Sequence, residues 1–163
     1  MKHILLISFV LTLSLQTIAQ WNIKAGLLTP IPVNVMSDYQ VDISSAIIQA
    51  DYNIKNKWHA TAATGYFRFR PQECNQKRFS NIPILAGVKY KFSDFHAGVM
   101  AGPALFNESE PKENYWKWLY MPYVGWSKNK WSIDLLYFNW EEVPNETNNI
   151  AVCVAYQIFG QSK

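Results

Sequence analysis

The sequence predicts an all-β fold in which eight antiparallel strands close into an up-and-down barrel. Three observations predict it. Apolar and polar residues alternate with a period of two along most of the chain, which a helix cannot produce. Short polar turns and longer polar loops follow one another strictly, as the hairpins of such a barrel require. After the first twenty residues no segment has a helical period or reaches the roughly 18 apolar residues of a membrane helix.

The composition and the N-terminus indicate one exported domain. A chain of 163 residues with 15% aromatic and 17% charged residues is too apolar to be disordered. Lys2, the apolar run 4–15 and the small residue Ala19 predict a secretory signal peptide over residues 1–19. The 15 basic side chains less Lys2 leave 14 against 12 acidic ones, a net charge of +2. That balance argues against nucleic acid as a partner.

The alternation defines the strands. In the hairpin 79–106, Ile84 and Val88 lie on an apolar face of the first strand, whereas Gly87 and Lys89 lie on the other face. Polar turns separate such segments throughout the chain. In chain order the predicted strands cover residues 21–29, 40–54, 58–70, 79–92, 95–106, 115–126, 131–140 and 149–159.

Two prolines fall inside predicted strands. Pro103 and Pro122 cannot donate a hydrogen bond to a neighbouring strand because proline has no backbone N–H. A closed barrel pairs each strand on both sides, so we expect a bulge or a local break in the hydrogen-bond ladder at each proline.

Alternation alone does not distinguish a membrane barrel, which is apolar outside, from a soluble ligand carrier such as a lipocalin, which is apolar inside. Tryptophans lie near the strand ends and aliphatic residues lie in the strand middles, as the two lipid interfaces require. We therefore predict an eight-stranded transmembrane β-barrel. A soluble periplasmic barrel that binds an apolar ligand is the alternative. The predicted aromatic girdle comprises Trp21, Trp58, Trp116, Trp118, Trp126 and Trp131.

The polar face carries charges among glycines and alanines, which suits a narrow lumen where charges pair. With the N-terminus of the barrel in the periplasm, both histidines of this face lie near the periplasmic end. Two interpretations remain open, namely salt bridges that fill the lumen or a cluster that responds to protons or ions. A pore is not expected, because eight strands enclose only enough space for side chains. The predicted lumen charge network comprises Lys24, Asp51, His59, Lys89, Lys91, His96 and Asp134.

Around the central hairpin the chain resembles the outer-membrane β-barrel domain family of Gram-negative bacteria. The resemblance rests on the strand IPILAGVKYKF, the tight turn and the strand FHAGVMAGPAL. It implies a location in the outer membrane, a signal peptide at 1–19 followed by a barrel domain at 20–163, and no cofactor or catalytic residues. The last strand is similar to the signal read by the barrel-assembly machinery. Tyr156 precedes a terminal apolar residue there, although Ile158 stands where phenylalanine is usual.

The loops supply the remaining candidate sites. Basic residues around the second long loop suit the phosphates of lipopolysaccharide, to which arginine offers a bidentate fork; a solvated rim is the alternative. The outer loops contain no histidine, so a lipid A-modifying enzyme with a base beside a serine such as Ser109 is not expected. No metal-ligand spacing occurs. We expect a monomer with a structural or surface-interaction role. The basic residues are Arg68, Arg70, Lys77 and Arg78.

Cys74 and Cys153 are the only cysteines of the sequence. Export would allow them to oxidise, but the predicted layout places them far apart. We expect two unpaired thiols.

Overall fold

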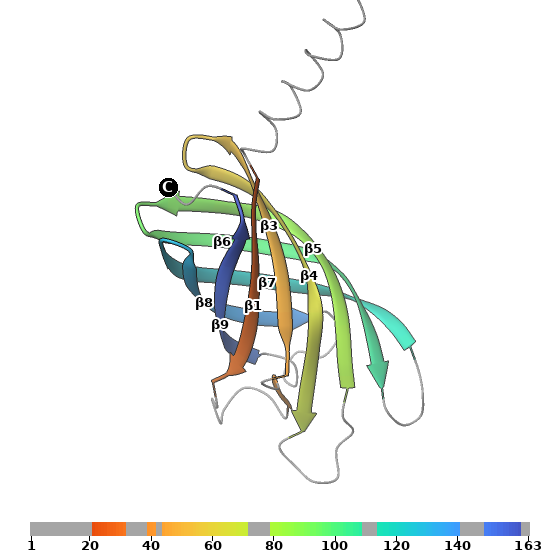
Figure 1. Ribbon diagram of the computed structural model, residues 1–163. Helices are drawn as coiled ribbons and strands as arrows, with labels where there is room; N and C mark the ends of the chain where they lie inside the picture. The colour runs from red at the N-terminus through yellow and green to blue at the C-terminus, as the bar shows by residue number, and fades with distance from the viewer. Residues whose placement is uncertain are drawn as a thin grey trace, which may run out of the picture.

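The computed structural model describes residues 21–31, 39–41, 44–71, 79–108, 114–140 and 149–160. Within these ranges the chain forms nine antiparallel strands, and eight of them close into a barrel (Figure 1). The ring runs from β1 through β3 to β9 in sequence order, and β9 pairs with β1. The predicted up-and-down topology is confirmed. The strands are β1 (Trp21–Pro30), β2 (Tyr39–Val41), β3 (Ala46–Lys55), β4 (Trp58–Pro71), β5 (Phe79–Phe92), β6 (Phe95–Glu108), β7 (Asn114–Lys128), β8 (Trp131–Trp140) and β9 (Asn149–Phe159).

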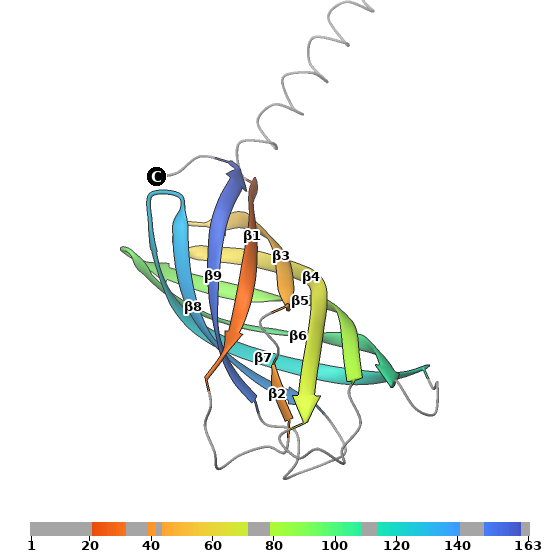
Figure 2. The same cartoon turned by 60° about the horizontal axis from the view of Figure 1, so that its bottom comes forward.

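The two ends of the barrel differ. Three two-residue turns, beginning at Asn56, Ser93 and Asn129, lie at one end, where β1 also begins and β9 ends (Figure 1). The first residue of each turn has a positive φ of 54–61°, a conformation that asparagine tolerates better than most residues. We call this the turn end. The opposite end, which comes forward in Figure 2, is the loop end. The predicted signal peptide lies outside the described residues, and none of these forms a helix able to cross a membrane.

The prediction of a single second strand over residues 40–54 is wrong in one respect, because this segment forms two strands, β2 and β3. β2 and β3 both pair with β4, but the register shifts between them. Ser45 occupies this junction. The backbone N–H of Arg68 donates to Ser45 Oγ at 2.9 Å, and the hydroxyl donates to the Arg68 carbonyl at 3.3 Å. A side chain therefore satisfies the backbone groups of β4 where the ladder is interrupted.

The prolines break the ladder locally without a bulge, which confirms one of the two expected outcomes. The β5–β6 pairing is interrupted opposite Pro103, and the β7–β8 pairing beside Pro122, while the register on either side is unchanged. Sequence reasoning did not anticipate the same effect at Pro83, where the β4–β5 ladder is interrupted. There the Thr64 hydroxyl donates to the Pro83 carbonyl at 2.8 Å. Each break follows from the missing proline N–H.

The barrel carries aliphatic side chains outside and charged side chains inside. Ile84 and Val99 are 58% and 46% exposed, whereas Lys89 and Asp134 are 6% and 2% exposed. A lipocalin-like carrier has the opposite arrangement, with an apolar interior open to a ligand. The structure therefore agrees with the membrane barrel and not with the soluble alternative.

The lumen is apolar toward the loop end and polar toward the turn end. Phe67 and Phe138 meet edge to face in the apolar half, with ring centroids 5.3 Å apart. Such a fully packed interior matches the space that eight strands enclose. We call this apolar half the plug. It comprises the buried residues Leu28, Phe67, Phe69, Leu85, Met100, Phe106, Leu119, Met121, Leu136 and Phe138.

Tyr123 separates the plug from the polar half of the lumen. Its ring lies over Gly98, the residue directly opposite on β6. A Cβ atom at Gly98 would come within 2.7 Å of the ring, so the glycine makes room for it. The Tyr123 hydroxyl meets the amide of Gln49 at 3.5 Å, on the polar side. Gly98 is thus required on the inner face because a larger residue would collide with the Tyr123 ring.

Candidate functional site

The polar half of the lumen holds two buried ion-pair clusters. Lys89 on β5 is bonded to Asp51 on β3. Lys24 Nζ lies 3.4 Å from Asp134 Oδ2, and His96 Nε2 lies 2.6 Å from Asp134 Oδ1. The strands β1, β6 and β8 therefore meet at one carboxylate. Five of the seven residues of the predicted charge network are brought together in this way.

The remaining two members of that network, His59 and Lys91, are half-buried near the turn end. Both line a cavity of about 70 Å³, which Lys24, Asp51, Lys89 and His96 also line. Lys130, from the last tight turn, contributes to the rim of this cavity. We call it the turn-end cavity. The structure thus places six of the seven predicted residues around one polar space, and the seventh, Asp134, is bonded to two of them.

Sequence reasoning missed a hydrogen-bonded chain of three side chains beside this cavity. Ser127 Oγ lies 3.2 Å from His96 Nδ1, and the other ring nitrogen bonds to Asp134. The register places His96, Gly125 and Asp134 in one row across β6, β7 and β8. A Cβ atom on Gly125 would collide with both His96 and Asp134, so the glycine permits their contact. The row is visible only when the strand pairing is known.

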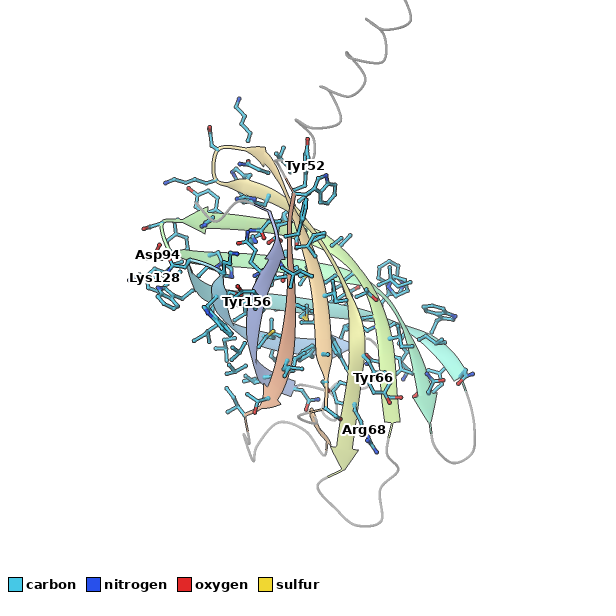
Figure 3. The ribbon with its side chains drawn as sticks, in the orientation of Figure 1. Tyr52, Tyr66, Arg68, Asp94, Lys128 and Tyr156 are labelled. Carbon is cyan, nitrogen blue, oxygen red and sulfur yellow. The ribbon has the colours of Figure 1, made fainter. Side chains whose placement is uncertain are left out.

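Of the four basic residues predicted to contact lipopolysaccharide, the structure describes one side chain. Arg68 lies on the outer face of β4 near the loop end, where it is half-buried (Figure 3). Arg70 belongs to β4, but its side chain is outside the described part, as are Lys77 and Arg78 entirely. Arg68 therefore faces the outside of the barrel wall and not the lumen.

Aromatic side chains form a belt at each end of the apolar exterior. Near the loop end, Trp116 and Trp118 are 58% and 52% exposed. Trp126, near the turn end, is half-buried. Three tryptophans at the turn end each pack at a tilt or edge to face against the tyrosine directly opposite on the adjacent strand, with ring centroids 5.0–5.1 Å apart. These pairs are Trp21–Tyr52, Trp58–Tyr90 and Trp131–Tyr156, of which Tyr52 and Tyr156 are marked in Figure 3.

Cys153 is a buried free thiol on the inner face of β9, and Cys74 lies outside the described residues. Among the side chains that the structure describes, no three His, Cys, Asp or Glu residues are grouped as a metal site requires.

No protein-family model and no curated protein match the chain. Solved structures do match it. The outer membrane protein Ail of Yersinia pestis, in a phospholipid bilayer nanodisc, superposes with a TM-score of 0.57 at 11% identity, over 86% of this chain and 99% of Ail. Neisserial surface protein A gives 0.48 at 15% identity, over 85% and 96% of the two chains. OprG of Pseudomonas aeruginosa gives 0.43 at 11%, over 86% and 94%. The superposition with Ail and the closed ring of eight strands show that this chain has the fold of the small outer-membrane β-barrels.

Proposed function

We propose that this protein is a monomeric barrel of the bacterial outer membrane with a structural or surface-interaction role, exerted at its loop end. The observation that carries the proposal is the reversed polarity of the barrel. Leu27, Ile84 and Val124 are 64%, 58% and 53% exposed, while the charged side chains are paired inside. An apolar band of this kind, bounded by aromatic belts, matches the hydrocarbon core and interfaces of a bilayer.

Two further features support the proposed environment. Tyr156 and Ile158 at the end of β9 face outward, 40% and 61% exposed, as a signal for the barrel-assembly machinery would need. Arg68 lies on the outer face near the loop end, and Arg70, Lys77 and Arg78 follow it closely in the sequence; we propose that these residues contact lipopolysaccharide phosphates. With the turn end in the periplasm, the described Arg68 lies on the side of the outer leaflet.

Fractionation of cells that express the full chain tests the location. We expect the protein in the outer-membrane fraction, soluble only with detergent, and with a gel mobility that changes on heating because the closed barrel resists unfolding. A soluble periplasmic species without heat-modifiable mobility would contradict the membrane assignment.

The plug predicts that the barrel does not conduct ions. Its ten side chains fill the loop-end half of the lumen, and four of them are phenylalanines with 0–1% exposure. We expect no stable conductance steps when the folded protein is reconstituted into planar bilayers, because no water path passes these side chains. Heat-modifiable mobility of the reconstituted protein is the control for folding and insertion. Reproducible open states from folded protein would refute the packed lumen and favour a pore.

The chain Ser127–His96–Asp134 has the residue types of a hydrolase triad, but its surroundings favour a structural role. The backbone N–H of Ser127, which could stabilise an oxyanion, donates instead to the Asp94 carbonyl at 2.7 Å. Asp134 is shared with Lys24 rather than reserved for the histidine. Both described histidines also lie toward the turn end, away from the outer leaflet. We therefore propose that the protein is not an enzyme and that the hydrogen bonds of Ser127 and Asp134 fix His96 inside the lumen.

A further inference from the structure

The turn-end cavity has an excess of positive charge. Four lysines line it against one carboxylate, that of Asp51. With Asp134 included, which does not line the cavity but is bonded to the lining residues Lys24 and His96, the net charge is +2 with neutral histidines. The carboxylates are used by Lys89 and Lys24, as described above. Within the described ranges, Lys91 and Lys130 form no ion pair. Two ammonium groups therefore remain for an anion.

An unpaired donor lies in the same cavity. Gln157 is 7% exposed, and its Nε2 has no hydrogen-bond partner in the structure. It lies directly opposite Lys24 in the β1–β9 pairing. Asn22, which also lines the cavity, has an unpaired Oδ1. Among the described residues, one further buried side chain has unpaired atoms, that of Asn81 at the loop end. A buried amide N–H without an acceptor is destabilising, so a ligand that brings an acceptor into the cavity would be stabilised there.

The size of the cavity limits the ligand. One water needs about 10–15 Å³ of such space. A cavity of about 70 Å³ therefore holds a few waters or one small anion and excludes a sugar or a lipid chain. It lies inside the barrel, so the anion comes from the aqueous phase at the turn end.

We propose that the turn-end cavity binds a small oxyanion of the inorganic phosphate type between Gln157, Lys91 and Lys130. The oxygens accept from the amide N–H and from both ammonium groups, and the negative charge offsets the lysine excess. Asn22 Oδ1 can accept from the O–H of hydrogenphosphate or from a water beside it. With the turn end in the periplasm, this is a periplasmic anion site, separate from the proposed role of the loop end.

Calorimetric titration of the folded protein with inorganic phosphate tests the proposal, in a maltoside detergent that carries no phosphate and at constant ionic strength set with sodium chloride. We expect saturable binding that Lys91→Gln with Lys130→Gln weakens by about tenfold or more, because two charge-assisted contacts are lost. Gln157→Leu should weaken it as well. The matched control is Lys55→Gln with Lys128→Gln, two exposed lysines of the same end that do not line the cavity.

Several outcomes would overturn the proposal. One is the absence of saturable binding to the folded protein, and another is an equal loss of binding in the control variant, which would show non-specific attraction to a basic surface. A lipid headgroup offers the same phosphate chemistry, so glycerophosphocholine is titrated in parallel. Tighter binding of that phosphodiester would assign the site to lipid and refute a free anion. Heat-modifiable mobility tells whether Gln157→Leu folds. If it does not fold, the lysine variants test the proposed site, because the side chains of Lys91 and Lys130 are less buried than that of Gln157.

Discussion

Replacement of Asp51 by alanine is expected to lower the free energy of unfolding by about 3–5 kcal/mol, because it leaves the Lys89 ammonium buried without its counter-ion. Asp51 and Lys89 are 1% and 6% exposed, and their side chains are bonded to each other. The substitution also removes one acceptor of the Gln49 amide, which donates to Asp51 Oδ1 at 2.8 Å and to Thr61 Oγ1 at 3.0 Å. No other carboxylate in the described lumen is free to replace it, because Asp134 is bonded to Lys24 and His96.

Urea unfolding of the barrel in lipid vesicles, followed by tryptophan fluorescence and by gel mobility, measures this loss. Asp94→Ala is the matched control, because this aspartate is exposed in a tight turn (Figure 3) and its substitution should stay within about 0.5 kcal/mol. A second variant, Asp51→Leu with Lys89→Met, removes both charges and should recover most of the stability. Equal effects of Asp51→Ala and Asp94→Ala would show that the lumen is hydrated and that the pair is not buried.

The faces of the strands could be predicted from the sequence because a barrel in lipid needs strict alternation. Val99 and Met100 are neighbours in the chain, yet one is 46% exposed and the other 1%. A period of two has no other simple structural cause. The tight turns were equally visible, since short polar segments such as Ser93 and Asp94 separate the apolar strands. The split between β2 and β3 was not, because Ser45 acts through a backbone contact with Arg68 that depends on the strand register.

The plug shows where alternation loses its information. Phe67, Phe106 and Phe138 occupy inward positions near the loop end. The outward position before each of them is also hydrophobic, namely Tyr66, Leu105 and Tyr137. A strand that is apolar on both faces carries no period to interpret. That these phenylalanines face inward can be predicted only by continuing the alternation seen in the polar half of each strand.

The partners within the lumen charge network depend on barrel closure. The alternation placed the residues of the network on the inner face, but it could not say which of them pair. Lys24 and Asp134 are 110 positions apart and meet because β9 joins β1 to β8. Gln157, which faces Lys24 across that seam, has an ordinary polar sequence context and no motif. Its unpaired amide, and with it the proposed anion site, appears only in three dimensions.

Substitution of an outward-facing residue in the middle of a strand tests whether lipid surrounds the barrel. Val99 lies on β6 midway between Phe95 in the turn-end belt and Pro103, which is opposite Trp118 of the other belt. Val99→Arg should lower the free energy of unfolding in lipid vesicles by about 2–4 kcal/mol, because a charge at the bilayer midplane loses its hydration. Ile54→Arg, at the turn end of β3, should cost only about 0–1 kcal/mol.

The comparison is informative because the two positions differ in depth and hardly in exposure. Val99 is 46% exposed and Ile54 is 58% exposed, so on a water-covered barrel both arginines would be solvated and both changes would stay near about 0.5 kcal/mol. Urea unfolding of both variants under identical lipid conditions gives the difference directly. A cost at Val99 that exceeds the cost at Ile54 follows only if the apolar band lies in hydrocarbon. Equal costs at the two positions would remove the physical basis for a membrane location, however apolar the exterior is.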